Sequence, residues 1–388
     1  KPPSSDIVKK KTESKDGKKR LKGGQKGHPR HERPKIPPEE IDNWYYYELD
    51  GCPVCGSRVE LRKDICRTFQ QIEIKAIPIE NSEHVIPGYW CEKCKKMHWP
   101  DIPDEIKSAG LFGSQFTALI GYMKYALHAS YSCIRNFIQD VLNVKICGGQ
   151  LSKLVSKVAK SLAVSYEELL NQIPLERYIN IDESGHKTNG ERFWTWCFRA
   201  SMYVLFKIDK SRGSKVLIEV LGREFDGVIG SDYFSAYRKY IKDFNVTVQF
   251  CIAHLIRDLK YLTTLKKMQD KEYGEKLLTF FRELFKIIHD CSDISNSDIK
   301  AQLEKTSRKI LKYAIDNAPQ TSDGQRIKKR FIKHGKEYFQ FITTPEIDPT
   351  NNVAEQAVRF IVIDRHVTQG TRSEEGQRTA EKFWTVMG

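Results

Sequence analysis

Three carboxylates in the chain, Asp182, Asp232 and Glu355, could work together although they lie far apart in sequence. Asp182 ends the segment 178–182, which is typical of a strand, and Asp232 follows the segment 227–231, which is typical of a short buried strand. We expect each aspartate to end its strand, so that both carboxylates reach the same sheet edge. Carboxylates grouped in this way hold two divalent metals about 3.5–4 Å apart in phosphodiester chemistry.

Glu355 would come from a helix packed across these strands. Asn351 and Asn352 are expected to cap that helix, and Val353, Ala357 and Val358 to give it an apolar face beside Glu355. The trio would then coordinate Mg²⁺ or Mn²⁺. Three competing acids are less suitably placed: Glu183 points to the opposite face if its strand continues, and two lie at loop-like edges, namely Asp209 and Asp226.

Several other side chains have two open interpretations. His254 follows another strand and either contacts a scissile phosphate or is a core histidine. Arg359, one helical turn after Glu355, either neutralises a phosphate or is a solvated surface charge, and the same holds for Arg365, Arg372 and Arg378. Trp194 and Trp196 either pack in a core, which we favour, or stack an unpaired base.

Two CxxC pairs, Cys52/Cys55 and Cys91/Cys94, have the spacing of zinc knuckles. Each tight turn can place two thiolates about 2.3 Å from one metal, so the two turns predict one structural Zn²⁺. The long spacer between the pairs requires a hairpin with an extra strand, and residues 71–76 alternate as a strand does. Cys66 and His98 are not expected to be ligands.

The net charge of +14 predicts a polyanionic partner. Residues 1–36 contain 13 Lys or Arg and 4 Asp or Glu, a surplus of +9, and few apolar residues, so we expect a tail that is disordered until it meets an acidic partner. The tail cations expected to contact DNA are Lys9, Lys10, Lys11, Lys18, Lys19, Arg20 and Lys22. The sequence contains no long apolar run and no secretory signal, and its cysteines have metal-ligand spacing, which favours a cytoplasmic, nucleoid-associated protein.

Apolar spacing predicts helices through residues 111–170, with a break at Cys147-Gly148-Gly149 and a further helix from Gln150 to Ala163 that carries Lys153 and Lys157. These helices form either a helix-turn-helix that contacts DNA through those lysines or an ordinary bundle.

From residue 177 the predicted order is β-β-β-α-β-α-β-α, which is the ribonuclease H-like layout. The expected fold is therefore multidomain α+β: a ribonuclease H-like α/β catalytic core with an all-α insertion, preceded by a zinc-ribbon-like module and a helical DNA-binding segment. The expected boundaries are 1–43 for the tail, 44–105 for the zinc module, 106–175 for the helices and 176–388 for the core, with its insertion at about 256–343.

Six motifs in this order resemble the TnpC-type transposase of the insertion sequence sixty-six family, a branch of the DDE transposases. They are Lys1–Ser5 with residues 23–28, the double CxxC, residues 181–184, residues 231–237, residues 251–254, and residues 351–355 with 369–373. The family often has Asp-Glu-Thr and Asp-Gly-Tyr where this chain has Asp182-Glu183-Ser184 and Asp232-Tyr233-Phe234. Members usually have a coiled-coil-like leader before these motifs and a short segment after them, so the resemblance leaves open whether this copy is truncated.

The resemblance implies cleavage and strand transfer at the ends of a mobile element, with Asp182, Asp232 and Glu355 as the triad. It also implies double-stranded DNA as partner, a homo-oligomer on that DNA and companion proteins of the element. Two alternatives remain open: a non-catalytic DNA-binding protein derived from a transposase, and a ribonuclease H-like nuclease or resolvase that hydrolyses without joining.

Overall fold

The computed structural model describes residues 35–44, 54–58, 69–71, 78–91, 93, 95–101, 103, 104, 106, 110–291, 296–344 and 346–388. Residues from Val85 onward belong to one compact unit, and those between Thr12 and His84 to another. In the second unit, a 3₁₀ helix, η1, spans Pro38–Glu40, and the backbone N–H and C=O of Ile36 both bond the side-chain amide of Gln70 at 2.8 and 2.9 Å.

The unit from Val85 onward contains a hairpin, a larger sheet and the helices. The antiparallel hairpin comprises β1 (Tyr89–Cys91) and β2 (Lys96–His98). The larger sheet comprises β3 (Tyr178–Thr188), β4 (Glu191–Arg199), β5 (Val204–Asp209), β6 (Val228–Ser231) and β7 (Thr247–Phe250). The helices are α3 (Ser114–Tyr125), α4 (Tyr131–Leu142), α5 (Gly148–Ser161), α6 (Ala163–Gln172), α7 (Ser214–Leu221), α8 (Ser235–Phe244), α9 (Ile252–Leu262), α10 (Met268–Asp290), α11 (Ser297–Asp316), α12 (Ser322–His334), α13 (Asn352–Thr368) and α14 (Glu374–Met387), with short 3₁₀ helices η2 (Ile173–Leu175), η3 (Lys336–Tyr338) and η4 (Gln340–Ile342).

The larger sheet has the strand order β5-β4-β3-β6-β7. Pairing is antiparallel from β5 through β4 to β3 and parallel from β3 through β6 to β7. The predicted succession of three antiparallel strands followed by parallel strands joined by helices is confirmed. One detail was wrong: Asp182 does not end its strand, because β3 stays paired with β4 as far as Thr188↔Glu191.

Each face of this sheet is covered by a different set of helices. Ile179 and Ile181 of β3 share a hydrophobic core with α7 and α8. On the other face, Cys197 of β4 and Phe206 of β5 share a core with α13, α14 and the helices α3 to α5. Lys153 and Lys157 are exposed on α5. The first turn of this helix includes Gly148 and Gly149, so these two glycines do not form the separate turn that the sequence predicted.

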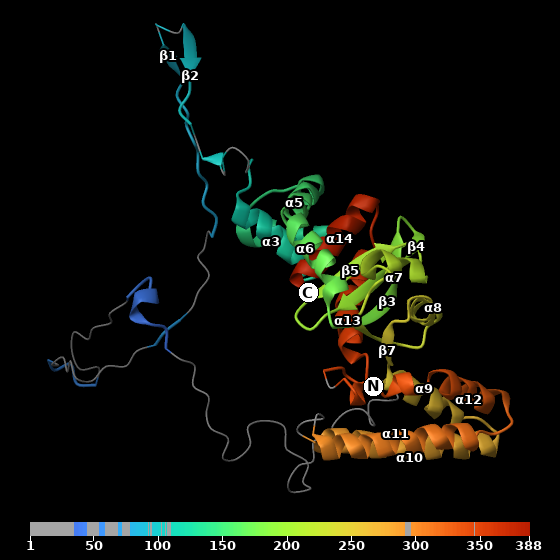
Figure 1. Cartoon of the computed structure of the whole chain (residues 1–388). Helices are drawn as coiled ribbons and strands as arrows, with labels where there is room; N and C mark the ends of the chain where they lie inside the picture. Colours follow the sequence, from blue (N-terminus) through green and yellow to red (C-terminus); the bar gives the residue numbers. More distant parts are fainter. Residues whose placement is uncertain are drawn as a thin grey trace. The chain divides into compact units, whose positions relative to one another are not determined.

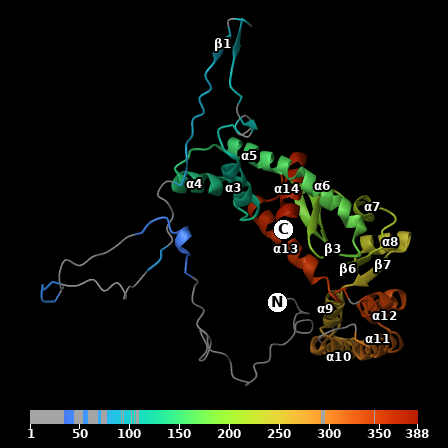
Figure 2. The same cartoon turned by 60° about the vertical axis from the view of Figure 1, so that its left-hand side comes forward.

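A third core extends from β7 into a helical layer. Val248 and Phe250 pack with apolar residues of α9 to α12, and α10, α11 and α12 lie beside one another (Figures 1 and 2). The all-helical pattern predicted for residues 254–343 thus corresponds, where the structure describes this stretch, to four long helices and two 3₁₀ turns. Among the described residues, no helix combines the length and apolar character needed to cross a membrane.

Gly370 connects α13 to the end of β3. Its φ of +97° lies in a region that favours glycine, and a Cβ there would lie 2.1 Å from the Lys187 carbonyl oxygen. The next residue, Thr371, donates its N–H to that oxygen at 2.9 Å and accepts the N–H of Asn189 at 2.9 Å. A side chain at residue 370 would therefore push this strand-like bridge away from β3.

We expect Gly370→Ala to lower the free energy of unfolding by about 1–3 kcal/mol, because a non-glycine residue is strained in this backbone conformation. Urea unfolding followed by circular dichroism measures the change. Gly149→Ala is the matched control, since a Cβ there meets nothing within 4 Å and lies in the first turn of a helix. Equal stability of the two variants would contradict this account of Gly370.

Candidate active site

Asp182 in β3 and Asp232, which directly follows β6, lie at the same level of the sheet. The parallel register pairs Asn180 with Gly230, and each aspartate lies two residues beyond its member of that pair. Adjacent strands lie about 4.8 Å apart, and residues two apart point to the same face. The expected meeting of these two carboxylates at one level of the sheet is therefore explained by the register, although β3 itself continues past Asp182.

Beyond Asn180, the edge of β3 that faces β6 has no strand partner among the described residues. Residues 351–371, which include α13 and are called the α13 segment below, cover this edge instead. The Asn351 side-chain amide donates to the Ile181 carbonyl at 2.8 Å, the Arg365 guanidinium donates to the Gly185 carbonyl, and the Thr371 N–H donates to the Lys187 carbonyl. These three bonds satisfy carbonyl groups that an uncovered edge would leave unpaired. They also fix α13 along β3.

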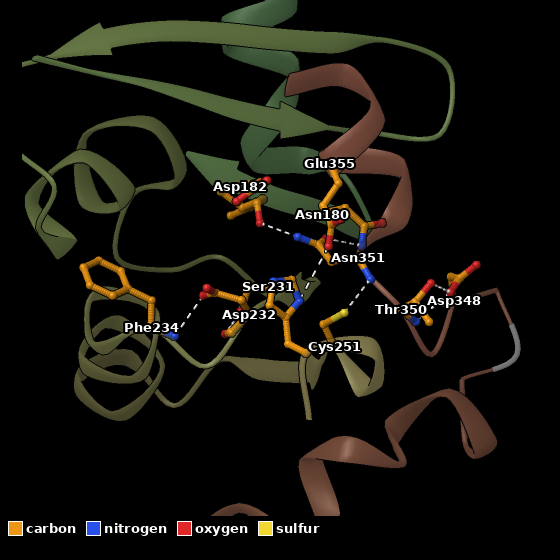
Figure 3. Close-up of polar contacts among 12 residues, drawn as sticks. Asn180, Asp182, Ser231, Asp232, Phe234, Cys251, Asp348, Thr350, Asn351 and Glu355 are labelled. Carbon is orange, nitrogen blue, oxygen red and sulfur yellow. Dashed lines mark hydrogen bonds and ion pairs between the residues drawn. The ribbon is translucent and has the colours of Figure 1, made fainter. Parts of the chain in front are cut away.

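Asn351 directly precedes α13 at the N-cap position but does not cap it in the expected way. Its side chain makes no capping hydrogen bond; it accepts from the Asn180 amide at 2.8 Å and donates to β3, while its backbone N–H donates to Cys251 Sγ at 3.1 Å. The predicted capping role was wrong because the Asn180 amide donates to the Asn351 Oδ1 that would otherwise accept a backbone N–H of the helix. The consequence is that Glu355, one turn later, is held beside Asp182 (Figure 3).

Asp182, Asp232 and Glu355 are electrostatic neighbours. Burial raises the pKa of Asp182 to about 8, and the charges of Glu183, Asp232 and Glu355 add to this increase. The Glu183 N–H, which donates to Asp182 Oδ1 at 2.9 Å, only partly offsets it. Asp232 accepts the Phe234 N–H at 2.9 Å, which orients its carboxylate at the start of α8. The site therefore gathers several carboxylates at a place where burial already disfavours the ionised form of Asp182.

Glu183 lies on the opposite face, as expected for a continuing strand. Its side chain is 2 % exposed, forms an ion pair with Arg212 at 2.8 Å and accepts the Tyr237 hydroxyl. Burial raises the pKa of Glu183, and the bonds from Tyr237 and Arg212 oppose that increase. Since its oxygens already have partners, Glu183 supports the strand behind the site.

The two tryptophans of β4 pack within the protein. Trp196 is fully buried and donates its indole N–H to the Ser211 carbonyl at 3.1 Å, so the core interpretation is confirmed for it. The Trp194 ring has the guanidinium carbons of Arg192 at 4.7 Å and Arg212 at 4.3 Å.

His254 lies in the first turn of α9 next to Glu355. Its Nδ1 is 3.6 Å from Glu355 Oε1, and burial and the Arg257 charge lower its pKa. Ligand atoms of Cys251, His254 and Glu355 lie within 4.8 Å of one another. Burial raises the pKa of Cys251 to about 12, so this thiol is protonated at neutral pH and acts as an acceptor for Asn351.

The remaining predicted residues are more scattered. Arg359 and Arg372 are exposed, whereas Arg365 bonds β3 and Arg378 pairs with Glu381 at 3.1 Å. The tail cations Lys9, Lys10, Lys11, Lys18, Lys19, Arg20 and Lys22 lie outside the described residues, as do Cys52, Cys66, Cys94 and the predicted strand residues 72–76. Of the four expected zinc ligands, Cys55 is exposed and Cys91 ends β1, directly before the turn that leads to β2.

The family model for the IS66 transposases matches residues 109–379, which include all three carboxylates and the helices that position them. The chain belongs to the IS66 transposase family. Membership indicates a transposase that acts on DNA, and it extends over the helices α3 to α6 as well as the sheet. A search of curated proteins finds no match.

The contact that joins two residues of this candidate site was not predicted from the sequence. Asn180 and Asn351 join β3 to α13, although they are 171 residues apart. A signal was present for Asn180, because an amide at a core-facing strand position beside Asp182 needs a polar partner. The fit of Gly230 against Asn180, where a Cβ would lie 2.3 Å from the amide nitrogen, had no sequence signature.

Proposed function

We propose that this chain is a DNA transposase that cleaves the ends of a mobile element and joins them to new DNA through Asp182, Asp232 and Glu355. The observation that carries the proposal is the convergence of these carboxylates, from β3, β6 and α13, at one level of the sheet. The sheet order, three antiparallel strands followed by two parallel ones, supports a ribonuclease H-like core.

The three carboxylates suit divalent cations. Their oxygens are the ligands that Mg²⁺ and Mn²⁺ prefer. Burial is the main cause of the raised pKa of Asp182, and the neighbouring negative charges that add to it are ones that a cation would neutralise. His254 Nδ1 is buried beside Glu355 and has no hydrogen-bond partner among the residues that the structure describes, which leaves a polar atom at the same site. When bound, the cations would supply activation of the attacking oxygen and stabilisation of the leaving oxygen.

Hydrogen bonds within the chain hold the site residues in position. Asn351 and Arg365 hold α13 against β3, which fixes Glu355 relative to Asp182. Phe234 orients Asp232 through its N–H, and the neutral form of His254, favoured by its lowered pKa, can accept or donate one proton at its ring nitrogens. Arg359, exposed one turn after Glu355, is placed to meet a phosphate of the bound DNA.

The test uses duplex DNA that carries the terminal inverted repeats of the element, labelled at the 3′ ends, with Mg²⁺ or Mn²⁺. Cleavage followed by joining of the labelled end to a second duplex is the expected result. Hydrolysis without joining would instead indicate a nuclease or resolvase, and binding without cleavage under either metal would indicate a DNA-binding derivative of a transposase.

The N-terminal part is proposed to recognise the element ends. In this proposal Cys52, Cys55, Cys91 and Cys94 hold one structural Zn²⁺, and the basic tail with Lys153 and Lys157 contacts phosphates. The β1–β2 hairpin supports the second knuckle, because Cys91 ends one strand and a tight turn follows, in which Lys95 donates its N–H to the Cys91 carbonyl at 2.8 Å. A homo-oligomer on DNA and companion proteins of the element complete the proposal.

We expect about one zinc per chain in the purified protein, because four thiolates complete a tetrahedral structural site. Zinc content by atomic absorption should fall to near zero in Cys52→Ser and remain unchanged in Asp182→Ala. Zinc retained in full by Cys52→Ser would exclude this ligand set.

A further inference from the structure

A basic cavity lies beside the β3–β4 hairpin and the C-terminal end of α13, apart from the three carboxylates. Its volume is about 480 Å³, and it is lined by Gly185, His186, Lys187, Gly190, Arg192, Arg365, His366 and Gln369. The lining therefore combines two segments that are about 180 residues apart in sequence.

The lining carries positive charge without a matching acid. None of its residues is an Asp or Glu, and within the described part of the chain Lys187, Arg192 and Arg365 form no ion pair with a carboxylate. Glu191, which precedes Arg192 in sequence, pairs with Lys210 at 3.0 Å and does not line the cavity. Unpaired cations gathered in a concave surface favour an anionic ligand.

The cavity is also held in shape. Arg365 donates to Ser184 Oγ at 3.0 Å and to the Gly185 carbonyl, while Thr371 bonds Thr188 Oγ1 at 2.9 Å and His186 Nε2 at 3.1 Å. Burial and the Arg365 charge lower the pKa of His186 to about 4, so its ring is neutral at physiological pH and packs against Trp384. By contrast, Lys187, Arg192 and His366 are exposed and can reach a ligand.

The cavity and two of the carboxylates, Asp182 and Glu355, lie on the same two elements, β3 and α13. Ser184 and His186 contact the α13 segment and share the strand face of Asp182, because residues two apart point the same way. Lys187 and its cross-strand partner Arg192 point to the other face, so the cavity includes residues of both faces near the end of the hairpin. Three strand residues separate Asp182 from Gly185, or about 10 Å. Ten helical residues separate Glu355 from Arg365, or about 15 Å.

We propose that this cavity binds a backbone phosphate of the DNA whose scissile bond lies at the carboxylates. The inference rests on the proposed function for its choice of DNA as the anion. With the duplex axis running along β3 and α13, a separation of about 10–15 Å along that axis corresponds to about three to four phosphates of one strand, so the contacted phosphate lies at that distance from the cleaved bond. The cavity thereby sets the direction in which the DNA leaves the site.

The test compares full-length wild type with Lys187→Ala/Arg192→Ala in binding to a short random-sequence duplex, without divalent cations, across a range of salt concentrations. We expect the slope of log affinity against log salt to fall by about 0.9 for each phosphate that the variant no longer neutralises. Lys187→Arg/Arg192→Lys keeps both charges and should keep the slope. Lys305→Ala/Lys312→Ala removes the same charge from exposed positions on α11 and should leave the slope unchanged.

A second measurement locates the phosphate. A single uncharged methylphosphonate linkage, moved along element-end DNA, should weaken wild-type binding about three to four positions from the cleaved bond and have no effect on the double alanine variant. An unchanged salt slope in Lys187→Ala/Arg192→Ala, or equal sensitivity of both proteins to the uncharged linkage, would overturn the cavity proposal alone. Failure of wild type to bind duplex DNA would overturn the proposed function as well.

Discussion

Asp182→Asn is expected to abolish cleavage and joining of element-end DNA while DNA binding persists. The substitution removes one anionic oxygen from the trio but keeps the size of the side chain. Even partners in the outer shell of a metal site contribute about 10- to 100-fold to affinity or activity, so we expect the loss of a direct ligand to cost more than about a hundredfold. Glu355→Gln should have the same effect, because α13 holds its carboxylate in the same site.

The control for this experiment is Asp226→Asn, which makes the same chemical change at an exposed position. Cleavage rates under single-turnover conditions and DNA affinities are measured for all variants. Near-normal cleavage by Asp182→Asn or Glu355→Gln, with Asp226→Asn unchanged, would rule out the triad. Parallel loss of affinity and cleavage would instead indicate that the variants no longer bind DNA.

The metal-free protein is expected to lose stability as pH rises from about 4 to about 8. The folded state holds the Asp182 proton up to a pKa of about 8, whereas the unfolded chain releases it near the ordinary aspartate pKa of 3.8. Within that window the folded state binds more protons, so the free energy of unfolding falls with pH, by at most about 1.4 kcal/mol per pH unit for one proton. Below and above the window this contribution is constant.

Divalent cations should reverse this loss. They compete with the proton for Asp182, so their affinity rises as pH approaches about 8. At a concentration about a hundredfold above its dissociation constant, a cation adds about 2.7 kcal/mol to stability. Urea unfolding of wild type in EDTA and in Mg²⁺, at several pH values, measures both effects.

Asp182→Asn is the control for the pH experiment, because its amide cannot titrate. Subtracting its stability from that of wild type removes the contribution of every other group that titrates equally in both proteins. We expect the free energy of unfolding of wild type, relative to that of Asp182→Asn, to decrease between pH 4 and pH 8. The increase in stability on adding Mg²⁺ should disappear in the variant. A difference that does not change with pH would show that the pKa of Asp182 is not raised.

The arrangement of Asp182 and Asp232 could be predicted because it depends on local patterns. Apolar runs identify β3 and β6, and a parallel register places residues that follow such strands at one level. The same reasoning placed Asp182 at the end of its strand, which was wrong. The residues after it, such as Ser184 and Gly185, are weak strand formers, and they remain extended because β4 and α13 bond both edges.

Contacts between distant segments could not be predicted from periodicity. The expectation that Asn351 caps a helix follows from local preference, but its Oδ1 accepts instead from the amide of Asn180, 171 residues away. The ion pair between Arg212 and Glu183 and the cavity beside Lys187 likewise depend on which segments pack together. Such contacts are decided by tertiary structure, and one sequence carries no direct record of them.

The covering of the β3 edge by α13 has a consequence for protein synthesis. Asp182 and Asp232 leave the ribosome long before Asn351, Arg365 and Thr371, which supply the bonds to that edge. A nascent chain that ends before residue 351 therefore holds two of the three carboxylates and an uncovered strand edge. The complete trio exists only after α13 has been synthesised and has packed on β3, so the proposed site cannot form on a chain that ends before this helix.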